Sequence, residues 1–375
     1  MTGKKITFLT TGDIRKIATM KRALGMANPL ADLGWRVSIV VLDCPENRVS
    51  IQSSCDDRIE IRYFAEGNAF AERRQKSRII RALNPDVLYC CSYSFRNRCA
   101  KKDLRRSSRL VVEHSELASA ILGLPKYKRW LYAYYEWLSV RTSDMIVAAS
   151  RWLQEYYARS SAHSGRGDLP VTYLPYAQDT IMDQINVEAY QQYSLKFSGH
   201  FNIIFLGSMI RNYGLFLMLE ACLVLRDSAA KYKLHLVGDG PDILEAREYA
   251  RLHGLSDMVE FAGYLPEESL NAYLKIADAF LVPLYPTIQD QARCPSKTYL
   301  YLPYKKPVLT CRIGESAHMF SDDRLFFVSG DSADLAVKIK SLNKDENYPL
   351  PDPADHTWQV RAQTFHLDMM SAWKE

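Results

Sequence analysis

A cluster of ionisable side chains follows a short apolar segment in the first half of the chain. The segment is Leu110–Val112, and Glu113, His114, Ser115 and Glu116 come directly after it. Carboxylates and imidazoles are the side chains that most often take a proton from a reacting hydroxyl. We expect Glu116 to be the base or acceptor contact, with Glu113 and then His114 as the next choices. The alternative, that one of them caps the following helix and another is solvated, stays open.

A lysine near the start of a predicted helix marks a second place where chemistry is expected. Pro295 and Ser296 precede Lys297, and Ser296 is the expected N-cap. A helix N-terminus presents unpaired N–H groups and the positive end of the helix dipole, so it favours anions. We expect Lys297 to be the principal cation for a phosphate. The competing interpretation is a solvated lysine at a helix start.

Glycines follow three of the predicted strands. Gly12 opens a turn in the first half, Gly207 and Gly214 bound a loop in the second, and Gly238-Asp239-Gly240-Pro241 forms a further loop. Glycine lets the backbone approach a phosphate closely, although each glycine could simply make a turn. The loop at 238–241 lacks the G-x-G-x-x-G spacing, so an NAD site is poorly supported.

Two similar sets of alternating strands and helices position these residues. In the first half the predicted strands are 6–10, 37–42, 59–64, 86–91, 110–112 and 145–149, and the predicted helices include 21–33 and 69–83. In the second half the predicted strands are 202–206, 233–237, 259–262, 279–283 and 307–310. This alternation is typical of parallel, doubly wound sheets, whose ligands bind beyond the carboxyl ends of the strands. We therefore expect an α/β fold with Rossmann-like domains at 1–175 and 200–354, a linker at 176–199, and a cleft between the domains.

Composition excludes several classes of protein. The chain has 375 residues, 47% hydrophobic and 24% charged, which is ordinary for a globular protein and unlike a disordered one. Its eight cysteines form no C-x-x-C pair, so neither a zinc site nor a redox motif is indicated. No Asp-x-Asp pair occurs, so we expect no metal site and no cofactor.

The charge is divided unevenly along the chain. Residues 1–175 carry 29 Lys and Arg against 17 Asp and Glu, a net +12, whereas residues 176–375 carry 19 against 26, a net −7. A basic half indicates an anionic partner, and the absence of nucleic-acid motifs favours a membrane or an acidic acceptor. No secretory apolar region and no run near ~20 apolar residues is present. We expect a cytoplasmic protein that associates peripherally with the cytosolic face of the membrane.

A basic and aromatic segment offers a membrane contact. It begins with Lys126, Lys128, Arg129 and Trp130, and an apolar helix face continues through Tyr134, Trp137 and Leu138. One hypothesis is an interfacial helix that touches anionic lipid or a lipid-linked acceptor. The other is a core helix with a solvated basic start.

Four segments of the second half resemble the nucleotide-binding domain of GT-B fold glycosyltransferases of the family 4 type, also called group 1. The segments are 205–221, 234–265, 277–285 and 295–309, in the order and spacing of that family. The stretch 173–179 resembles the family's hinge, and 356–365 its closing tryptophan helix, which is expected to pack back on the first domain over about 355–375. The resemblance implies a metal-independent enzyme that moves a sugar from a UDP- or GDP-sugar to a glycan or lipid-linked acceptor. Such enzymes make surface polysaccharides and glycoconjugates.

The resemblance also implies a set of donor contacts. Tyr264 and Leu265 fall where the family's main chain contacts the base. The other implied nucleotide-sugar contacts are Gly12, Gly207, Ser208, Arg211, Gly238, Asp239, Gly240, Pro295, Ser296, Lys297 and Thr298.

The chain departs from the family at three donor positions. Ser208 and Tyr213 stand where an Arg and a Lys are usual, with Arg211 as a substitute, and Leu300 stands in the place of a glutamate. The segment 295–297 resembles the xanthan-type glucuronosyltransferase branch, in which Arg293 could pair with a uronic acid carboxylate. These departures keep two alternatives open: a non-catalytic nucleotide-binding GT-B protein and a nucleotide-sugar epimerase.

Overall fold

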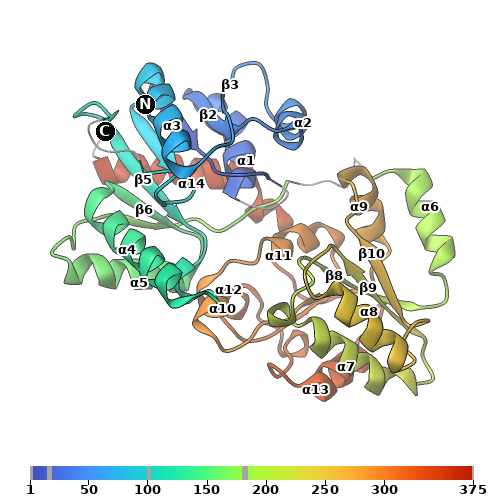
Figure 1. Cartoon of the computed structure of the whole chain (residues 1–375). Helices are drawn as coiled ribbons and strands as arrows, with labels where there is room; N and C mark the ends of the chain where they lie inside the picture. The colour runs from blue at the N-terminus through green and yellow to red at the C-terminus, as the bar shows by residue number, and fades with distance from the viewer. Residues whose placement is uncertain (1–2, 15–18, 99–102, 180–184, 374–375) are drawn as a thin grey trace. The chain divides into compact units, whose positions relative to one another are not determined.

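The chain divides into two compact units. The structure is a computed structural model that describes residues 3–14, 19–98, 103–179 and 185–373. Unit 1 comprises Met1–Gln178, Ala292–Cys294 and His356–Glu375, and unit 2 comprises Asp179–Gln291 and Pro295–Asp355 (Figure 1). Each unit is an α/β layered structure with its own parallel sheet.

Unit 1 is built on a seven-stranded parallel sheet of order β3-β2-β1-β4-β5-β6-β7. The strands are β1 (Lys5–Leu9), β2 (Arg36–Leu42), β3 (Glu60–Phe64), β4 (Val87–Cys90), β5 (Arg109–His114), β6 (Met145–Ala148) and β7 (Val171–Tyr173). The central strands are buried almost throughout, which fits their runs of Val, Ile and Leu. The strand order changes direction between β1 and β4, so ligands are expected beyond the carboxyl ends of these and neighbouring strands.

Helices cover the sheet of unit 1. They are α1 (Thr19–Asp32), α2 (Pro45–Ser54), α3 (Ala69–Leu83), α4 (Lys126–Thr142), α5 (Arg151–His163) and α14 (Trp358–Trp373). The C-terminal helix α14 packs along α1, at the other end of the sequence (Figure 1). Gly25 permits this packing, because a Cβ there would lie 2.4 Å from ring atoms of Trp358.

Unit 2 has a five-stranded parallel sheet of order β10-β9-β8-β11-β12. Its strands are β8 (Phe201–Leu206), β9 (Tyr232–Val237), β10 (Val259–Gly263), β11 (Ala279–Val282) and β12 (Val308–Thr310). Its helices are α6 (Val187–Lys196), α7 (Leu215–Arg226), α8 (Ile243–Leu252), α9 (Glu267–Lys275), α10 (Ile288–Ala292), α11 (Ser296–Tyr301), α12 (Glu315–Met319) and α13 (Ser332–Ser341). One continuous hydrophobic core joins the sheet to α7 and α13.

The two-sheet α/β architecture predicted from the alternation of elements is confirmed. Each predicted strand has a counterpart, with ends that differ by one or two residues. The structure adds elements that the sequence did not predict, namely β7, α2, α5, α9, α10, α12 and α13. Inside the expected linker 176–199, α6 packs on α9, and the boundary between the units falls between Gln178 and Asp179.

The prediction of one apolar face on α4 is wrong in part. Leu138 is buried, but Trp130 is 78% exposed and Tyr134 and Trp137 are each nearly half exposed. The helix instead buries Tyr135 and Leu138 against the sheet side, because these two residues project toward the cluster around Val112. Within the part of the chain that the structure describes, no helix is both long and apolar enough to cross a bilayer.

Candidate functional site

In unit 2, three loops meet at the carboxyl ends of β8, β9 and β10. The amide of Gly207 donates to the carbonyl of Val237 over 2.9 Å, and the amide of Gly238 donates to that of Gly263 over 2.7 Å. The amide of Met209 donates to the Asp239 carbonyl over 3.0 Å. These bonds continue the sheet beyond its strands, so the loops are held by backbone and need little help from side chains.

The glycines of these loops are required by contact with neighbouring backbone. A Cβ on Gly238 would lie 2.1 Å from the carbonyl oxygen of Gly207, and one on Gly240 would lie 2.5 Å from that of Met209. Gly207 and Gly238 also have φ values of +150° and +129°, which L side chains rarely adopt. The structure therefore makes a surface of bare backbone at these strand ends.

Lys297 lies against this bare backbone. A Cβ on Gly207 would lie 2.7 Å from the Lys297 Nζ, and the same ammonium lies 3.9 Å from the centroid of the Phe205 ring. Lys297 is the second residue of α11, whose later residue Tyr301 accepts the Leu206 amide on its hydroxyl over 2.8 Å. The fold thus brings Lys297 and Gly207 together from segments 90 positions apart in the sequence.

The predicted cap of α11 is wrong by one position. Pro295 occupies the N-cap, Ser296 is the first helical residue, and no side chain caps the helix. Pro295 favours this arrangement because its fixed φ, here −68°, and extended ψ lead directly into the helix. Ser296 is partly buried, and Thr298 is buried in the turn that follows.

Arg211 makes its contacts with α8 and with the first turn of α7. Its guanidinium donates to Glu245 of α8 over 2.5 Å and stacks on Phe216 at 3.9 Å, and its amide donates to Asp242 over 2.6 Å. Ser208 is exposed beside it. The side chain that was expected to replace a missing cation is therefore engaged in a solvent-exposed ion pair.

The remaining donor positions divide by exposure. Tyr264 is 68% exposed after β10, and Asp239 is exposed at the tip of its loop. Leu265 packs against the core of unit 2, and Leu300 does the same from α11. Leu300 therefore contributes apolar packing at the position where a ribose-binding glutamate was implied.

In unit 1, Glu113 forms a buried ion pair. Arg22 Nε donates to its carboxylate over 2.8 Å, and the hydroxyl of Tyr89 donates to the other oxygen over 3.1 Å. Both charged side chains are fully buried. Burial raises the pKa of Glu113, and Arg22 opposes that change. Both carboxylate oxygens are engaged inside the protein, so the environment of Glu113 is that of a structural group.

His114 is also enclosed. Its Nε2 lies 2.9 Å from the Ser139 hydroxyl, and its Nδ1 lies 2.9 Å from the Tyr157 hydroxyl, with the two rings stacked at 4.2 Å. Burial lowers the pKa of His114 to about 3. The imidazole is therefore neutral at neutral pH, with both nitrogens engaged.

Glu116 is the member of the cluster whose side chain remains exposed. The protein around it still removes enough water to raise its pKa, an effect that Arg293 opposes and Glu136 reinforces. Glu136 accepts the amide and hydroxyl of Ser119 over 2.9 and 2.6 Å, so it is fixed in place. Of the three predicted groups, Glu116 is the one whose side chain the structure leaves exposed.

The cluster of buried contacts around Arg22 was not predicted. Its guanidinium donates to the carbonyl of Leu174 over 2.7 Å and lies over the rings of Tyr176 and Trp358. An arginine inside a predicted amphipathic helix gives no sign that it will be buried. Its place follows from contacts with distant segments, chiefly Glu113, 91 positions away, and the carbonyl of Leu174.

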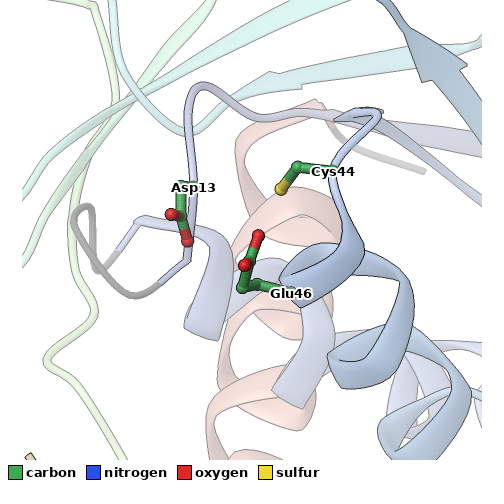
Figure 2. A group of neighbouring side chains, drawn as sticks. All are labelled: Asp13, Cys44 and Glu46. Carbon is green, nitrogen blue, oxygen red and sulfur yellow. The ribbon is translucent and has the colours of Figure 1, made fainter.

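A small polar cluster lies beside Gly12. Asp13, Cys44 and Glu46 point toward one another, with their ligand atoms within 4.8 Å (Figure 2). Gly12 itself is held by its carbonyl, which accepts from the Asn47 side chain over 3.1 Å. Burial and the hydrogen bond to Glu46 raise the pKa of the Cys44 thiol. The thiol is therefore protonated at neutral pH.

Comparison with known sequences gives a family match and one curated relative. Residues 186–356 match the family model described as glycosyl transferases group 1. A stretch of 81 residues is 31% identical to the putative colanic acid biosynthesis glycosyltransferase WcaL of Escherichia coli strain K12 and covers 22% of this chain. That match takes in 20% of WcaL, so the chain spans about a fifth of the length of this curated relative.

Comparison with solved structures extends over the whole chain. HepE of Anabaena in complex with UDP-glucose has a TM-score of 0.72 at 14% identity, over 98% of this chain and 94% of HepE. A glycosyltransferase of Rickettsia africae has a TM-score of 0.65 at 13% identity, over 98% and 94% of the two chains. The lipopolysaccharide outer core galactosyltransferase WaaB has a TM-score of 0.63 at 12% identity, over 98% and 99%. At these identities the likeness concerns the fold, and it confirms the predicted GT-B fold class.

Proposed function

We propose that this chain moves a sugar from a UDP-sugar to a glycan or lipid-linked acceptor, because residues 186–356 match the model of the group 1 glycosyltransferases. Its product would be a surface polysaccharide or glycoconjugate. The name of WcaL, which refers to colanic acid biosynthesis, supports this class of product. HepE, which was solved with UDP-glucose, supports uridine over guanosine in the donor.

The contact between Lys297 and Gly207 carries the proposal. Sugar transfer leaves a diphosphate, so negative charge grows on the leaving oxygen, and fixed positive potential stabilises that charge. A glycine at 207 lets a phosphate approach the main chain, and the Lys297 ammonium lies where that glycine has no side chain. The pair therefore offers one cation and a bare backbone to the same diphosphate.

The chemistry proposed here needs no metal clamp on the diphosphate. The sequence contains no Asp-x-Asp pair, which metal-dependent sugar transferases of the other large fold use. Lys297 and the first amides of α11 would supply the positive potential instead.

Glu116 is proposed to contact the acceptor hydroxyl. Its raised pKa suits a group that takes a proton near neutral pH, as an inverting reaction requires. Glu113 would hold the loop after β5 through Arg22, and His114 would fix it through Ser139 and Tyr157. If configuration is retained, Glu116 would orient the acceptor and need not act as a base.

Arg293 is the basis for proposing which type of sugar is transferred. Arg293 lies close enough to Glu116 to lower its pKa, and a guanidinium also binds a uronic acid carboxylate. A hexuronate donor would therefore be preferred over a neutral hexose. The test compares the transfer rates from UDP-glucuronate and UDP-glucose in wild type and in Arg293→Gln. A preference of wild type for UDP-glucuronate that Arg293→Gln abolishes supports the glucuronosyl type.

A thermal-shift series with UDP, GDP, CDP and ADP, followed by UDP-sugars, tests the donor site. A ligand at ~100 times its Kd stabilises the protein by about 2.7 kcal/mol. We expect UDP to raise the melting temperature of wild type and of the control Lys306→Ala, and to lose most of its effect on Lys297→Ala. No response of wild type to any nucleotide would contradict the proposal.

A non-catalytic nucleotide-binding protein is the second candidate. Two donor positions favour this candidate, because neither offers a polar contact to a nucleotide-sugar. Arg211 is paired with Glu245, and Leu300 packs against the core of unit 2. Such a protein would respond to UDP and depend on Lys297, yet release no UDP from UDP-sugars across a panel of glycan and polyprenyl-phosphate acceptors. Release of UDP that requires an acceptor identifies the transferase.

A further inference from the structure

Helix α4 presents a row of aromatic side chains to solvent. Trp130 is 78% exposed and Tyr127 is 68% exposed, and Leu131, Tyr134 and Trp137 are each close to half exposed. We call these five residues the aromatic stripe. At helical spacing they lie along one side of α4, and the rings of Tyr134 and Trp137 are already in contact at 5.9 Å between centroids.

The aromatic stripe is not the packing face of the helix. α4 is held on unit 1 by other residues, chiefly Tyr135, Leu138 and Ser139, which are buried. Exposed single apolar residues are ordinary, but a contiguous row of large rings indicates a surface that is covered in use. The stripe therefore calls for an occupant outside this unit.

Basic side chains border the stripe. Lys126, Lys128 and Arg129 are exposed in the first turn, and Arg141 lies over the Trp137 ring at 4.8 Å. The single acidic residue of α4, Glu136, is buried and hydrogen-bonded to Ser119. The solvent-facing side of the helix thus carries only positive charge, within a half of the chain whose net charge is +12 by the count given above.

We propose that the aromatic stripe of α4 and its basic border dock the protein on an anionic lipid bilayer. Indole and phenol rings settle at the level of the lipid headgroups, where their apolar bodies and polar tips are both satisfied. Lysine and arginine gain from the negative surface potential of anionic lipid. The docking does not depend on sugar transfer, although it would bring unit 1 to a lipid-linked acceptor.

Charge favours an anionic bilayer over a second copy of the chain as the partner of the aromatic stripe. A symmetric dimer through α4 would place the stripe of one copy on that of the other. The lysines and arginines of both copies would then meet with no exposed acidic partner on α4, which is unfavourable. An anionic bilayer supplies the complementary charge over the whole length of the helix.

Flotation with vesicles tests the proposal. The full chain is mixed with vesicles of phosphatidylcholine alone or with about a third phosphatidylglycerol, at low salt and at 0.5 M NaCl, where the Debye length falls well below ~8 Å. We expect flotation with the anionic vesicles only, reduced at least tenfold by salt. Trp130→Ala/Trp137→Ala should lower the partition coefficient at least tenfold, and Lys126→Gln/Lys128→Gln/Arg129→Gln should do the same.

The control is Leu244→Ala/Leu252→Ala, which removes two exposed apolar side chains from α8 in unit 2. It should float as wild type does. Since all the altered side chains are exposed, each variant is expected to keep the wild-type melting temperature and the wild-type response to UDP. The response to UDP reports on the donor site alone, so failure of docking and failure of the proposed function are seen separately.

Three results would overturn the proposal. They are no flotation of wild type with anionic vesicles at low salt, equal flotation of Trp130→Ala/Trp137→Ala, and equal loss in the α8 control. A dimer in solution that Trp130→Ala/Trp137→Ala dissolves would assign the stripe to self-association instead. Conversely, quenching of tryptophan emission by brominated lipid, lost in the Trp130→Ala/Trp137→Ala variant, would place these rings in the headgroup layer.

Discussion

Three ionisable residues at and just beyond the carboxyl end of β5 acquire three different environments. Glu113 is paired with Arg22, His114 is neutral between two hydroxyls, and Glu116 keeps its side chain in solvent. Their residue types alone make all three candidates for proton transfer, and the sequence ranks Glu116 first, Glu113 second and His114 third. Burial decides among them, because a group that reacts must reach a substrate as well as hold or lose a proton.

A pH profile of sugar transfer tests the role of Glu116. Burial raises its pKa, so the carboxylate is lost as the pH falls at a higher pH than for an ordinary glutamate. If Glu116 is the base, the rate rises with pH through that pKa, and Glu116→Gln lowers kcat by about 10²–10⁴ and removes the acid limb. Initial rates between pH 4 and 9 give both readouts.

The control for this profile is Glu155→Gln, an exposed residue of α5. It should keep the rate and the acid limb of wild type. An acid limb that persists in an active Glu116→Gln enzyme would show that another group titrates, and Glu116 would then be limited to orienting the acceptor.

At the level of elements, glycines decide where two segments can meet. In unit 2, Gly238 and Gly240 let the loops after β8 and β9 touch through backbone. In unit 1, Gly25 lets α14 lie on α1. In both places the cost of a Cβ is set by what it would strike: rigid backbone in unit 2 and a large buried ring in unit 1.

Gly25→Ala is predicted to destabilise unit 1. The new Cβ would lie 2.4 Å from the Trp358 ring, which is 6% exposed and cannot swing into solvent without unpacking α14. Overpacking of this kind costs about 1–3 kcal/mol, which exceeds the gain from replacing glycine inside a helix. Urea unfolding followed by far-ultraviolet circular dichroism measures the loss.

Replacing Trp358 with a smaller side chain should relieve the overpacking caused by Gly25→Ala. In the double variant Gly25→Ala/Trp358→Leu, the Cβ has room, so the two changes are expected to be less than additive in a double-mutant cycle. If the losses simply add, the contact between Gly25 and Trp358 does not limit the packing of α1 against α14.

At the level of the whole molecule, the chain leaves unit 1 after Gln178, contributes Ala292–Cys294 to it, and returns to it finally at His356. The two passages are tied together within unit 1: the Gln178 amide donates to the His356 carbonyl over 3.0 Å. Arg22 secures both, through the carbonyl of Leu174 and the ring of Trp358. One buried arginine therefore links the sheet, α1 and the segments that connect the units.

Arg22→Met is predicted to destabilise β5, the segment before Gln178 and α14 together. It would leave Glu113 buried without its cation, a change that costs about 3–5 kcal/mol. Hydrogen exchange followed by mass spectrometry should show faster exchange in peptides covering β5, residues 171–178 and α14, while the strands of unit 2 exchange as in wild type. Arg159→Met, an exposed position on α5, is the matched control. Equal acceleration in β8 and β9 would contradict a role confined to unit 1.

Local pattern determined the fold class, since apolar runs of four to seven residues alternating with helical stretches admit few arrangements other than parallel sheets. It also located the loops at 207, 238 and 297, because glycine and a helix start are visible in short stretches of sequence. It failed for β7, α2 and α5, whose stability comes from contacts that a short window does not contain.

Only the tertiary structure decided the surroundings of each candidate residue. It placed Lys297 beside Gly207, turned Arg211 to Glu245, and enclosed Glu113 and His114 while leaving Glu116 exposed. It also exposed the aromatic stripe of α4, although the helical period of α4 is equally compatible with burial. The reason is physical: residue type and spacing set what a side chain can do, but burial, charge partners and approach distances arise from segments far apart in the sequence, and these choose among the possibilities.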